Sequence, residues 1–118
     1  MKPYLLGIDI GTSACKAAIF DKDGHAMSAA SSDYEVYYPR EGWAEQDPKE
    51  WWEAVCHAVK ESLKRGGVKP EDIAGIGIDG QSWSAVAVDR SGRTLTNTPI
   101  WMDTRAADIC DEMNDKIG

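Results

Sequence analysis

A short apolar segment near the N-terminus runs directly into a polar turn, and this junction constrains the fold more than any other part of the chain. Residues 4–10 are mostly large and apolar, which is typical of a buried strand. Gly11 follows, and a residue without a Cβ lets the backbone turn tightly. Backbone N–H groups of such a turn, with the hydroxyls of Thr12 and Ser13, can hold a phosphate. The residues alone leave two interpretations open: a phosphate-binding turn, or a hairpin with a polar turn.

Two charged residues flank this turn. Asp9 stands at the end of the expected strand, where its carboxylate could reach a magnesium ion directly or through the ion's waters. Lys16 could add a cationic donor to a bound phosphate. These parts suit phosphoryl transfer, in which a protein mostly positions groups and neutralises charge. The alternatives are structural: Asp9 could satisfy N–H groups of the turn, and Lys16 could be an outward-facing strand lysine.

The order of the expected elements predicts an α/β fold. Three strands joined by tight turns make an antiparallel meander, and a helix then leads to a fourth strand. A mixed sheet with helices packed on it is the expected result. The expected ranges are strands at Tyr4–Ile10, Ala14–Phe20, Ala26–Ser32 and Ile73–Asp79, and a helix from Asp47-Pro48 to Gly66-Gly67.

The last third of the chain predicts shorter elements. Residues 83–88 and 93–96 are expected to pair as strands about the Asp89–Gly92 turn. Residues 99–101 read as a short extended piece, and apolar residues recur at helical spacing from Thr104 onward. In the strand at Ile73–Asp79, alternation places isoleucines on one face and Gly75, Gly77 and Asp79 on the other. Asp79 could be a solvated acid at a strand end or could line a cleft, and the solvated position is the favoured one.

Composition excludes several classes of protein. The 118 residues suffice for one modest domain, and the net charge of −7 with no basic stripe argues against a nucleic-acid partner. No run approaches the roughly 20 apolar residues of a membrane span, and no signal peptide opens the chain, so we expect no membrane partner and a cytoplasmic protein. The three cysteines are expected to be free thiols without a metal. His25 and His57 have no neighbouring nucleophile, so no catalytic role is assigned to them.

Four motifs occur in order along the chain. They are L-G-I-D-I-G-T-S at residues 6–13, G-W-A-E-Q-D-P at 42–48, G-I-D-G-Q-S-W at 77–83 and I-W-M-D-T-R at 100–105. Together they resemble the N-terminal part of the FGGY-family carbohydrate kinases, the family of xylulokinase, gluconate kinase and glycerol kinase. The resemblance covers the whole chain. It implies an actin-like, ribonuclease-H-like fold, with ATP and Mg²⁺ as cofactors and a small-molecule sugar as substrate.

The resemblance also implies roles for individual residues. Asp9 would serve the magnesium ion at the β- and γ-phosphates. Gly11, Thr12 and Ser13 would form the first phosphate loop, and Lys16 stands where relatives often carry a basic residue near the transferred phosphoryl group. The catalytic aspartate, which acts as general base on the sugar hydroxyl, would lie beyond residue 118. No residue of this chain is therefore expected to be catalytic, and residues 1–118 would be the N-terminal part of the first kinase domain.

Two segments match the sugar side of the family's site. They supply six residues, namely Gln81, Ser82, Trp83, Trp101, Asp103 and Arg105. Simpler interpretations of the same residues remain open. Gln81 could bond the backbone at a tight turn, and either tryptophan could pack in a core. Asp103 could cap the last helix, and Arg105 could pair with Asp103.

One departure from the family bears on the substrate. Glycerol kinases carry Arg-Glu after the glutamine and xylulokinases typically carry Met-His, whereas this chain has Ser82-Trp83. Glycerol is therefore disfavoured, and a pentulose such as xylulose is expected. Two other functions remain open: a non-catalytic nucleotide- or sugar-binding module, and an actin- or chaperone-like ATPase. The isolated chain is expected to be inactive and to self-associate, with a homodimer as one form.

Overall fold

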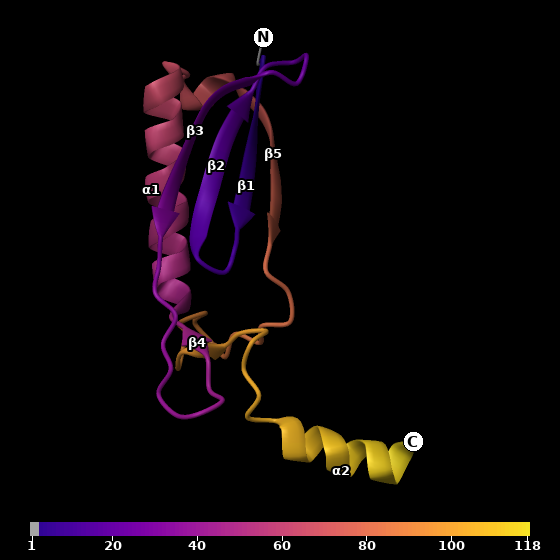
Figure 1. Cartoon of the computed structure of the whole chain (residues 1–118). Helices are drawn as coiled ribbons and strands as arrows, with labels where there is room; N and C mark the ends of the chain where they lie inside the picture. Colours follow the sequence, from indigo (N-terminus) through magenta and orange to yellow (C-terminus); the bar gives the residue numbers. More distant parts are fainter. Residues whose placement is uncertain (1–2) are drawn as a thin grey trace. The chain divides into compact units, whose positions relative to one another are not determined.

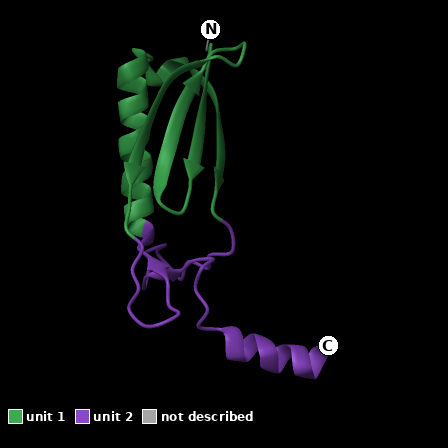
Figure 2. Ribbon diagram, in the orientation of Figure 1, with its two compact units in different colours: residues 1–35, 49–81 green, residues 36–48, 82–118 purple. Residues whose placement is uncertain are grey.

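The computed structural model describes residues 3–118 (Figure 1). Contacts within the chain divide it into two compact units, coloured separately in Figure 2. The first unit comprises residues 1–35 and 49–81, and the second comprises residues 36–48 and 82–118. Each unit is assembled from two separate stretches of sequence, so neither is a simple run of neighbouring elements.

The first unit is a four-stranded mixed sheet with the order β3-β2-β1-β5. The meander is confirmed: β1 (Tyr4–Ile10) pairs antiparallel with β2 (Ala14–Phe20), and β2 pairs antiparallel with β3 (Ala26–Asp33). After a helix the chain returns as β5 (Ile73–Gly80), which runs parallel to β1, as a crossover connection requires. A short 3₁₀ helix at Pro70–Asp72, which the sequence analysis did not predict, leads into β5.

The core of this unit lies between one face of the sheet and α1 (Pro48–Gly66). Figure 1 shows α1 running alongside the strands. The core members come from β1, β2, α1 and the residue pair that follows the helix; they are Leu6, Ile8, Cys15, Ala17, Ile19, Ala54, Ala58 and Val68. The small alanines of α1 allow the helix to approach the sheet closely.

Strand alternation assigns every side chain of the sheet to one face or the other. Ile76 and Ile78 of β5 are register partners of the core residues Leu6 and Ile8, so they lie on the same face as α1. They are nevertheless 61% and 67% exposed, because the described core cluster includes residues of β1 and β2 but, of β5, is contacted only by Ile73 at its start. The opposite face carries small residues and charges.

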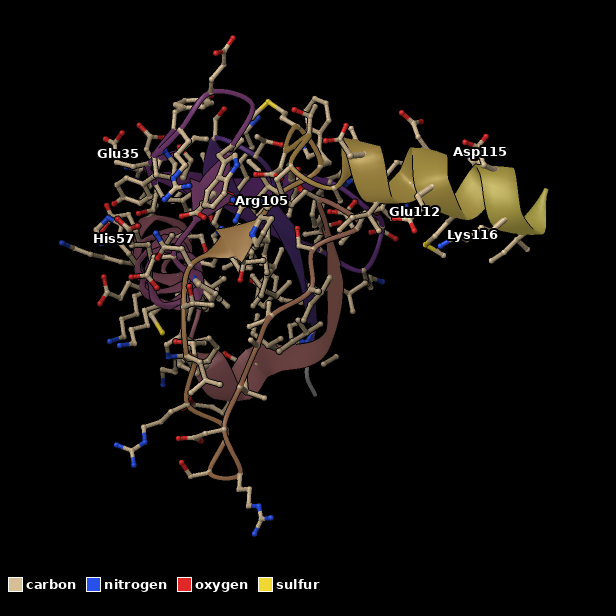
Figure 3. All side chains as sticks on the ribbon, turned by 90° about the horizontal axis from the view of Figure 1, so that it is seen from below. Glu35, His57, Arg105, Glu112, Asp115 and Lys116 are labelled. Carbon is tan, nitrogen blue, oxygen red and sulfur yellow. The ribbon has the colours of Figure 1, made fainter. Side chains whose placement is uncertain are left out.

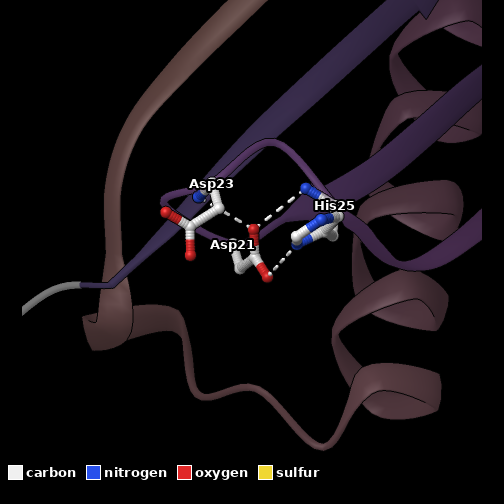
Figure 4. Close-up of side chains that lie close together, drawn as sticks. All are labelled: Asp21, Asp23 and His25. Atoms are coloured by element: carbon white, nitrogen blue, oxygen red, sulfur yellow. Dashed lines mark hydrogen bonds and ion pairs between the residues drawn. The ribbon is translucent and has the colours of Figure 1, made fainter.

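The turn between β2 and β3 is closed by a single carboxylate (Figure 4). Asp21 Oδ1 accepts the backbone N–H groups of Asp23 and His25 at 2.9 Å each, and Asp21 Oδ2 lies 3.1 Å from His25 Nδ1. The backbone hydrogen bond from His25 is the main cause that lowers the pKa of Asp21. Gly24 takes a φ of 86° there, a conformation that favours glycine.

The second unit contains a minimal sheet that the sequence analysis missed. Its strands are β4 (Glu45–Gln46) and β6 (Thr98–Pro99), which pair antiparallel. Gln46 and Thr98 are almost fully buried at this junction. Two-residue strands leave no periodicity to detect, and the partners here are about fifty positions apart.

The expected strand pair at residues 83–88 and 93–96 is wrong in extent. Among the described residues, only one isolated bridge joins these segments, between Val88 and Thr94, with a hydrogen bond from Leu95 N–H to the Ala87 carbonyl at 2.9 Å. The turn itself forms, because Asp89 Oδ1 accepts the N–H groups of Ser91 and Arg93. Val88 of the bridge and Val86, two positions before it, are both exposed, so no buried face selects a longer ladder.

The chain ends in α2 (Ala107–Ile117), which begins three residues later than the Thr104 start of the expected helix. Its apolar residues Ile109, Met113 and Ile117 are spaced four apart and are all exposed. Glu112 and Lys116 form an ion pair on the helix surface and are labelled in Figure 3. In the part of the chain that the structure describes, no helix has the length and apolar character needed to cross a membrane.

Candidate functional site

Two carboxylates meet at the carboxyl ends of β1 and β5. Asp9 and Asp79 are register partners in the parallel pair, and both side chains lie on the sheet face opposite α1. A hydrogen bond between the two carboxyl groups, and then their like charge, raise the pKa of Asp79. The sequence analysis favoured a solvated Asp79. Asp79 is exposed, and the strand register also places it beside Asp9, the predicted metal residue.

The predicted phosphate loop is the turn that joins β1 to β2. Its ends are closed by a hydrogen bond from Gly11 N–H to the Ala14 carbonyl at 3.0 Å. A Cβ on Gly11 would lie only 3.2 Å from that carbonyl oxygen, so the tight turn favours glycine here. Thr12 is half-buried and Ser13 is exposed. The turn therefore presents hydroxyl-bearing residues directly beyond Asp9.

Lys16 lies opposite Asp9 across the antiparallel pair. The two residues are register partners in β1 and β2, and directly opposed residues project from the same face of a sheet. Lys16 is exposed. The three ionisable residues Asp9, Lys16 and Asp79 thus occupy neighbouring positions on three adjacent strands.

A cavity of about 780 Å³ covers this face of the first unit. Its size falls within the range of small-molecule sites. Glycines and alanines are prominent in its lining, while Asp9, Lys16 and Asp79 supply charges on the strands. Arg65 also borders it and donates from Nη1 to the Ala29 carbonyl at 3.0 Å.

Gln81 is held against the phosphate loop. Its backbone N–H donates to the Ile10 carbonyl at 2.9 Å, and its side-chain Nε2 donates to the Gly11 carbonyl at 3.4 Å. Of the two roles considered from the sequence, these contacts favour the one in which Gln81 bonds the backbone at a tight turn. The glutamine follows β5 directly, so the parallel register of β5 with β1 carries it to this position.

Tyr34 is a further residue at this loop, and the sequence analysis missed it. Its hydroxyl donates to the Gly11 carbonyl, and its backbone N–H donates to the Ser13 carbonyl at 3.2 Å. Burial is the main cause that raises the pKa of Tyr34 to about 12, with the nearby Cys15 and Asp9 adding to it. No local pattern could have revealed this contact, because the hydroxyl and its acceptor are 23 positions apart.

Trp83, in the second unit, has an unusual backbone. Its φ is 67°, which is uncommon for a bulky residue and costs about 1–3 kcal/mol. Its side chain is 92% exposed, so packing in a core does not account for the strain. Ser82 beside it is also exposed. The expected alternative, that Trp83 packs in a core, does not hold within the described residues.

Asp103 and Arg105 are bound to each other. Arg105 Nε lies 2.9 and 3.0 Å from the two carboxylate oxygens of Asp103, and Nη2 lies 2.8 Å from Oδ2. Arg105 Nη2 also donates to Glu45 Oε2 at 2.7 Å, and Ala44 N–H donates to Asp103 Oδ2 at 2.8 Å. The sequence analysis considered this pairing. Its other suggestion, that Asp103 caps the last helix, is wrong: α2 has Ala106 at its N-cap, without a side-chain cap.

The Arg105 network has a strong electrostatic character. Hydrogen bonds from Arg105 are the main cause that lowers the pKa of Asp103 to about 2, and the bonds to Asp103 and Glu45 raise the pKa of Arg105. The guanidinium also lies 3.7 Å from the centroid of the Trp43 ring, a cation–π stack. Arg105 is labelled in Figure 3. Trp101, close by in sequence, is 54% exposed.

The predicted residues therefore fall into two sets. The first unit brings together Asp9, Gly11, Thr12, Ser13, Lys16 and Gln81. The second unit holds Ser82, Trp83, Trp101, Asp103 and Arg105. Within the second set, the charges of Asp103 and Arg105 are already paired in the described structure, and Arg105 also pairs with Glu45.

Comparison with known families decides the assignment. The family model described as "FGGY family of carbohydrate kinases, N-terminal domain" matches residues 4–118. The chain belongs to the FGGY family of carbohydrate kinases. The resemblance found in the sequence motifs is thereby confirmed, as is the actin-like, ribonuclease-H-like α/β fold. The reading as an unrelated actin- or chaperone-like ATPase is set aside.

Three FGGY kinases illustrate how similar this chain is to known members of the family. Glycerol kinase 2 of Thermotoga maritima is 39% identical over 96% of this chain and 23% of its own length. A protein from Brucella ovis named xyloylose kinase is 33% identical with a TM-score of 0.90, over 96% of this chain and 24% of that one. The glycerol kinase of Plasmodium falciparum with ADP is 25% identical with a TM-score of 0.86, over 98% of this chain and 23% of that one.

The small share of each relative that this chain covers limits what the family assignment says about function. The chain spans about a quarter of the length of the curated relatives it matches. Sequence relatives named for glycerol and structural neighbours named for xylulose both match this FGGY chain. The family is therefore established, while the sugar has to be argued from the residues.

Proposed function

We propose that residues 1–118 supply the phosphate side and part of the sugar side of an ATP-dependent carbohydrate kinase. The whole enzyme would move the γ-phosphoryl group of ATP to a sugar hydroxyl. The observation that carries this proposal is the meeting of Asp9, Asp79 and the Gly11 turn at one end of the sheet. Membership of the FGGY family supports it.

The residues at this end of the sheet fit a magnesium ion. Carboxylate oxygens are the protein ligands that Mg²⁺ prefers, and Mg²⁺ is usually bound through one or two of them. Asp9 would hold the ion, directly or through its waters, and Asp79 adds a second negative charge beside it. Bound Mg²⁺ supplies charge neutralisation at the phosphates.

The turn and the lysine would hold the phosphates themselves. Gly11 keeps the turn tight, and the Thr12 and Ser13 hydroxyls and backbone N–H groups can donate to phosphate oxygens. Lys16 lies opposite Asp9 and offers a positive charge on the same face. We assign the general base to no residue of this chain.

For the sugar, we infer a pentulose such as xylulose. Support comes from Ser82-Trp83, which stand where glycerol kinases carry Arg-Glu, and from an indole that is free to meet the C–H face of a sugar. Xylulose kinases among the structural neighbours agree with this inference. The glycerol kinases among the sequence relatives point the other way, and glycerol is the competitor to test.

Asp103 and Arg105 are proposed to act on the sugar side as a fixed pair. Their charges compensate each other, so together they present a polar edge and no free cation. Trp101, with half of its surface exposed, would add a second aromatic face. Gln81 contacts the loop in this structure, and its sugar contact remains a proposal.

A phosphorylation screen tests the proposed function. The full-length gene product would be offered ketoses, polyols and aldonates with Mg·ATP, and ADP release would be followed. ADP release with a pentulose above all other acceptors supports the assignment. ADP release that never depends on a sugar would contradict kinase activity and favour a non-catalytic binding module.

A further inference from the structure

The Gly11 carbonyl is approached by two side-chain donors from different parts of the sheet. The Tyr34 hydroxyl comes from the segment after β3, and Gln81 Nε2 comes from the residue after β5. A carbonyl oxygen has two lone pairs and can accept both. The middle of the β1–β2 turn is therefore fixed from both sides, although the turn itself is only a few residues long.

Tyr34 makes a second contact that spans the turn. Its backbone N–H donates to the Ser13 carbonyl while its hydroxyl reaches the Gly11 carbonyl. One residue thus bonds the carbonyls of the two residues that flank Thr12. Gln81 bonds two consecutive carbonyls at the start of the turn: its backbone N–H donates to Ile10 and its side-chain Nε2 donates to Gly11.

We infer that Tyr34 is a positioning residue for the phosphate-binding turn, and that with Gln81 it holds the Gly11–Ser13 backbone in the conformation that meets the nucleotide phosphates. The inference rests on the proposed function, because it presumes that this turn binds phosphate. Its physical basis is preorganisation: a turn whose carbonyls are fixed by hydrogen bonds does not have to be ordered when the ligand arrives.

The surroundings of Tyr34 suit a donor that must stay in one place. Its ring packs against the core cluster under the sheet, so the hydroxyl has little freedom to leave the turn. The phenol remains protonated throughout the neutral range, since its pKa is about 12, and it can always donate. A phenylalanine would keep the ring packing and remove only the donor.

The test compares Tyr34→Phe with a matched control in this chain. Tyr38→Phe removes the same hydroxyl from a tyrosine that is exposed and lies outside the first unit. Amide hydrogen exchange is measured by NMR without ligand, and Mg·ATP is titrated up to tens of millimolar. A second variant, Gln81→Met, removes the other donor to Gly11 and guards against a folding defect in Tyr34→Phe.

We expect faster exchange at Thr12 and Ser13 in Tyr34→Phe and Gln81→Met, with the strands unchanged. The dissociation constant for Mg·ATP should rise about two- to tenfold, as loss of one neutral hydrogen bond produces. Tyr38→Phe should match the unaltered chain in both measurements. A lower thermal midpoint with unchanged exchange at the turn and unchanged affinity would show a merely structural tyrosine and overturn the inference.

The two proposals fail in different ways. If the unaltered chain binds Mg·ATP and Tyr34→Phe binds it equally well, the inference is wrong and the proposed function stands. If the unaltered chain shows no shift at residues 11–13 with Mg·ATP, the proposed phosphate site is wrong, and the positioning role for the nucleotide falls with it. Faster exchange in the variant would then show only that Tyr34 orders the turn.

Discussion

Asp9 and Asp79 lie side by side on two parallel strands, and their carboxyl groups share a hydrogen bond. That bond exists only while one of the two groups holds a proton, because two ionised carboxylates have no hydrogen to donate. Two like charges in adjacent register on one sheet face are unfavourable unless a proton or a cation lies between them. The pair is therefore a feature that stability measurements and metal titrations can both detect.

Asp79→Asn should stabilise the chain at neutral pH. The pKa of Asp79 is raised in the folded state, so its favourable contribution exists below the unfolded-state value of about 3.9 and is lost as the pH rises through the folded-state value. An amide keeps the hydrogen bond and removes the repulsion. Thermal midpoints measured from about pH 3 to about pH 8 should show a gain for the variant that disappears in acid.

The control for this experiment is Asp33→Asn, which removes an exposed acid at the end of β3. It should give no comparable gain. Mg²⁺ should raise the midpoint of the unaltered chain more than that of Asp79→Asn. Equal midpoints for Asp79→Asn and the unaltered chain at all pH values would contradict the pairing.

Asp9→Asn should strongly reduce turnover of the full-length enzyme. The change is nearly isosteric and removes one negative charge from the proposed metal site. Loss of one well-placed electrostatic contact costs about two to three powers of ten in rate. Turnover is measured at saturating Mg²⁺ and sugar, with Asp33→Asn as the control. Near-normal kcat in Asp9→Asn would remove this residue from the metal site.

The sequence predicts the first unit well because its signals are local. Strands β1 and β2 have the expected bounds, and alternation places Ile76 and Ile78 opposite Asp79 as expected. The exposure of those isoleucines was not predictable, since it depends on what covers β5. Likewise, the Tyr34 contact with Gly11 depends on the register of the folded sheet.

In the second unit the sequence predicts less. The β4–β6 pair joins segments about fifty positions apart, and the bond between Arg105 and Glu45 joins residues 60 positions apart. No local sequence pattern indicates such distant partners. Motif resemblance drew attention to Asp103 and Arg105, whose role on the sugar side stays a prediction. It could not show that they are bonded to each other.

Asp103→Asn should destabilise the second unit. The pKa of Asp103 is lowered to about 2, so its stabilising contribution is present above the unfolded value of about 3.9 and is lost as the pH falls through about 2. Loss of its charged hydrogen bonds should cost on the order of 2 kcal/mol at neutral pH. Denaturant unfolding followed by Trp fluorescence measures this, and the difference from the unaltered chain should shrink in acid. A difference independent of pH would contradict the ion-pair assignment.

Trp83→Ala should affect the sugar more than the nucleotide. Its indole is exposed and makes no core contribution, so removing it should leave the fold intact and raise KM for the sugar. KM for ATP should change little. Leu95→Ala, at another exposed apolar residue of the same unit, is the control. If glycerol is the best acceptor of the full-length enzyme by kcat/KM, the interpretation of Ser82-Trp83 is wrong.

The isolated chain should self-associate and should not transfer phosphate. Strand β5 is an edge strand with a bare isoleucine pair, and its neighbours on the other face are glycines and Asp79. An apolar edge without a protecting lysine or proline is a template for a second copy. Light scattering should show oligomers that Ile78→Lys disperses and Leu95→Lys does not.

ATP binding by the isolated chain should be no tighter than about millimolar, because one phosphate turn engages only part of a nucleotide. Sugar-dependent ADP release by the chain alone would contradict this expectation and would require the base to be sought among Asp79 and Asp103.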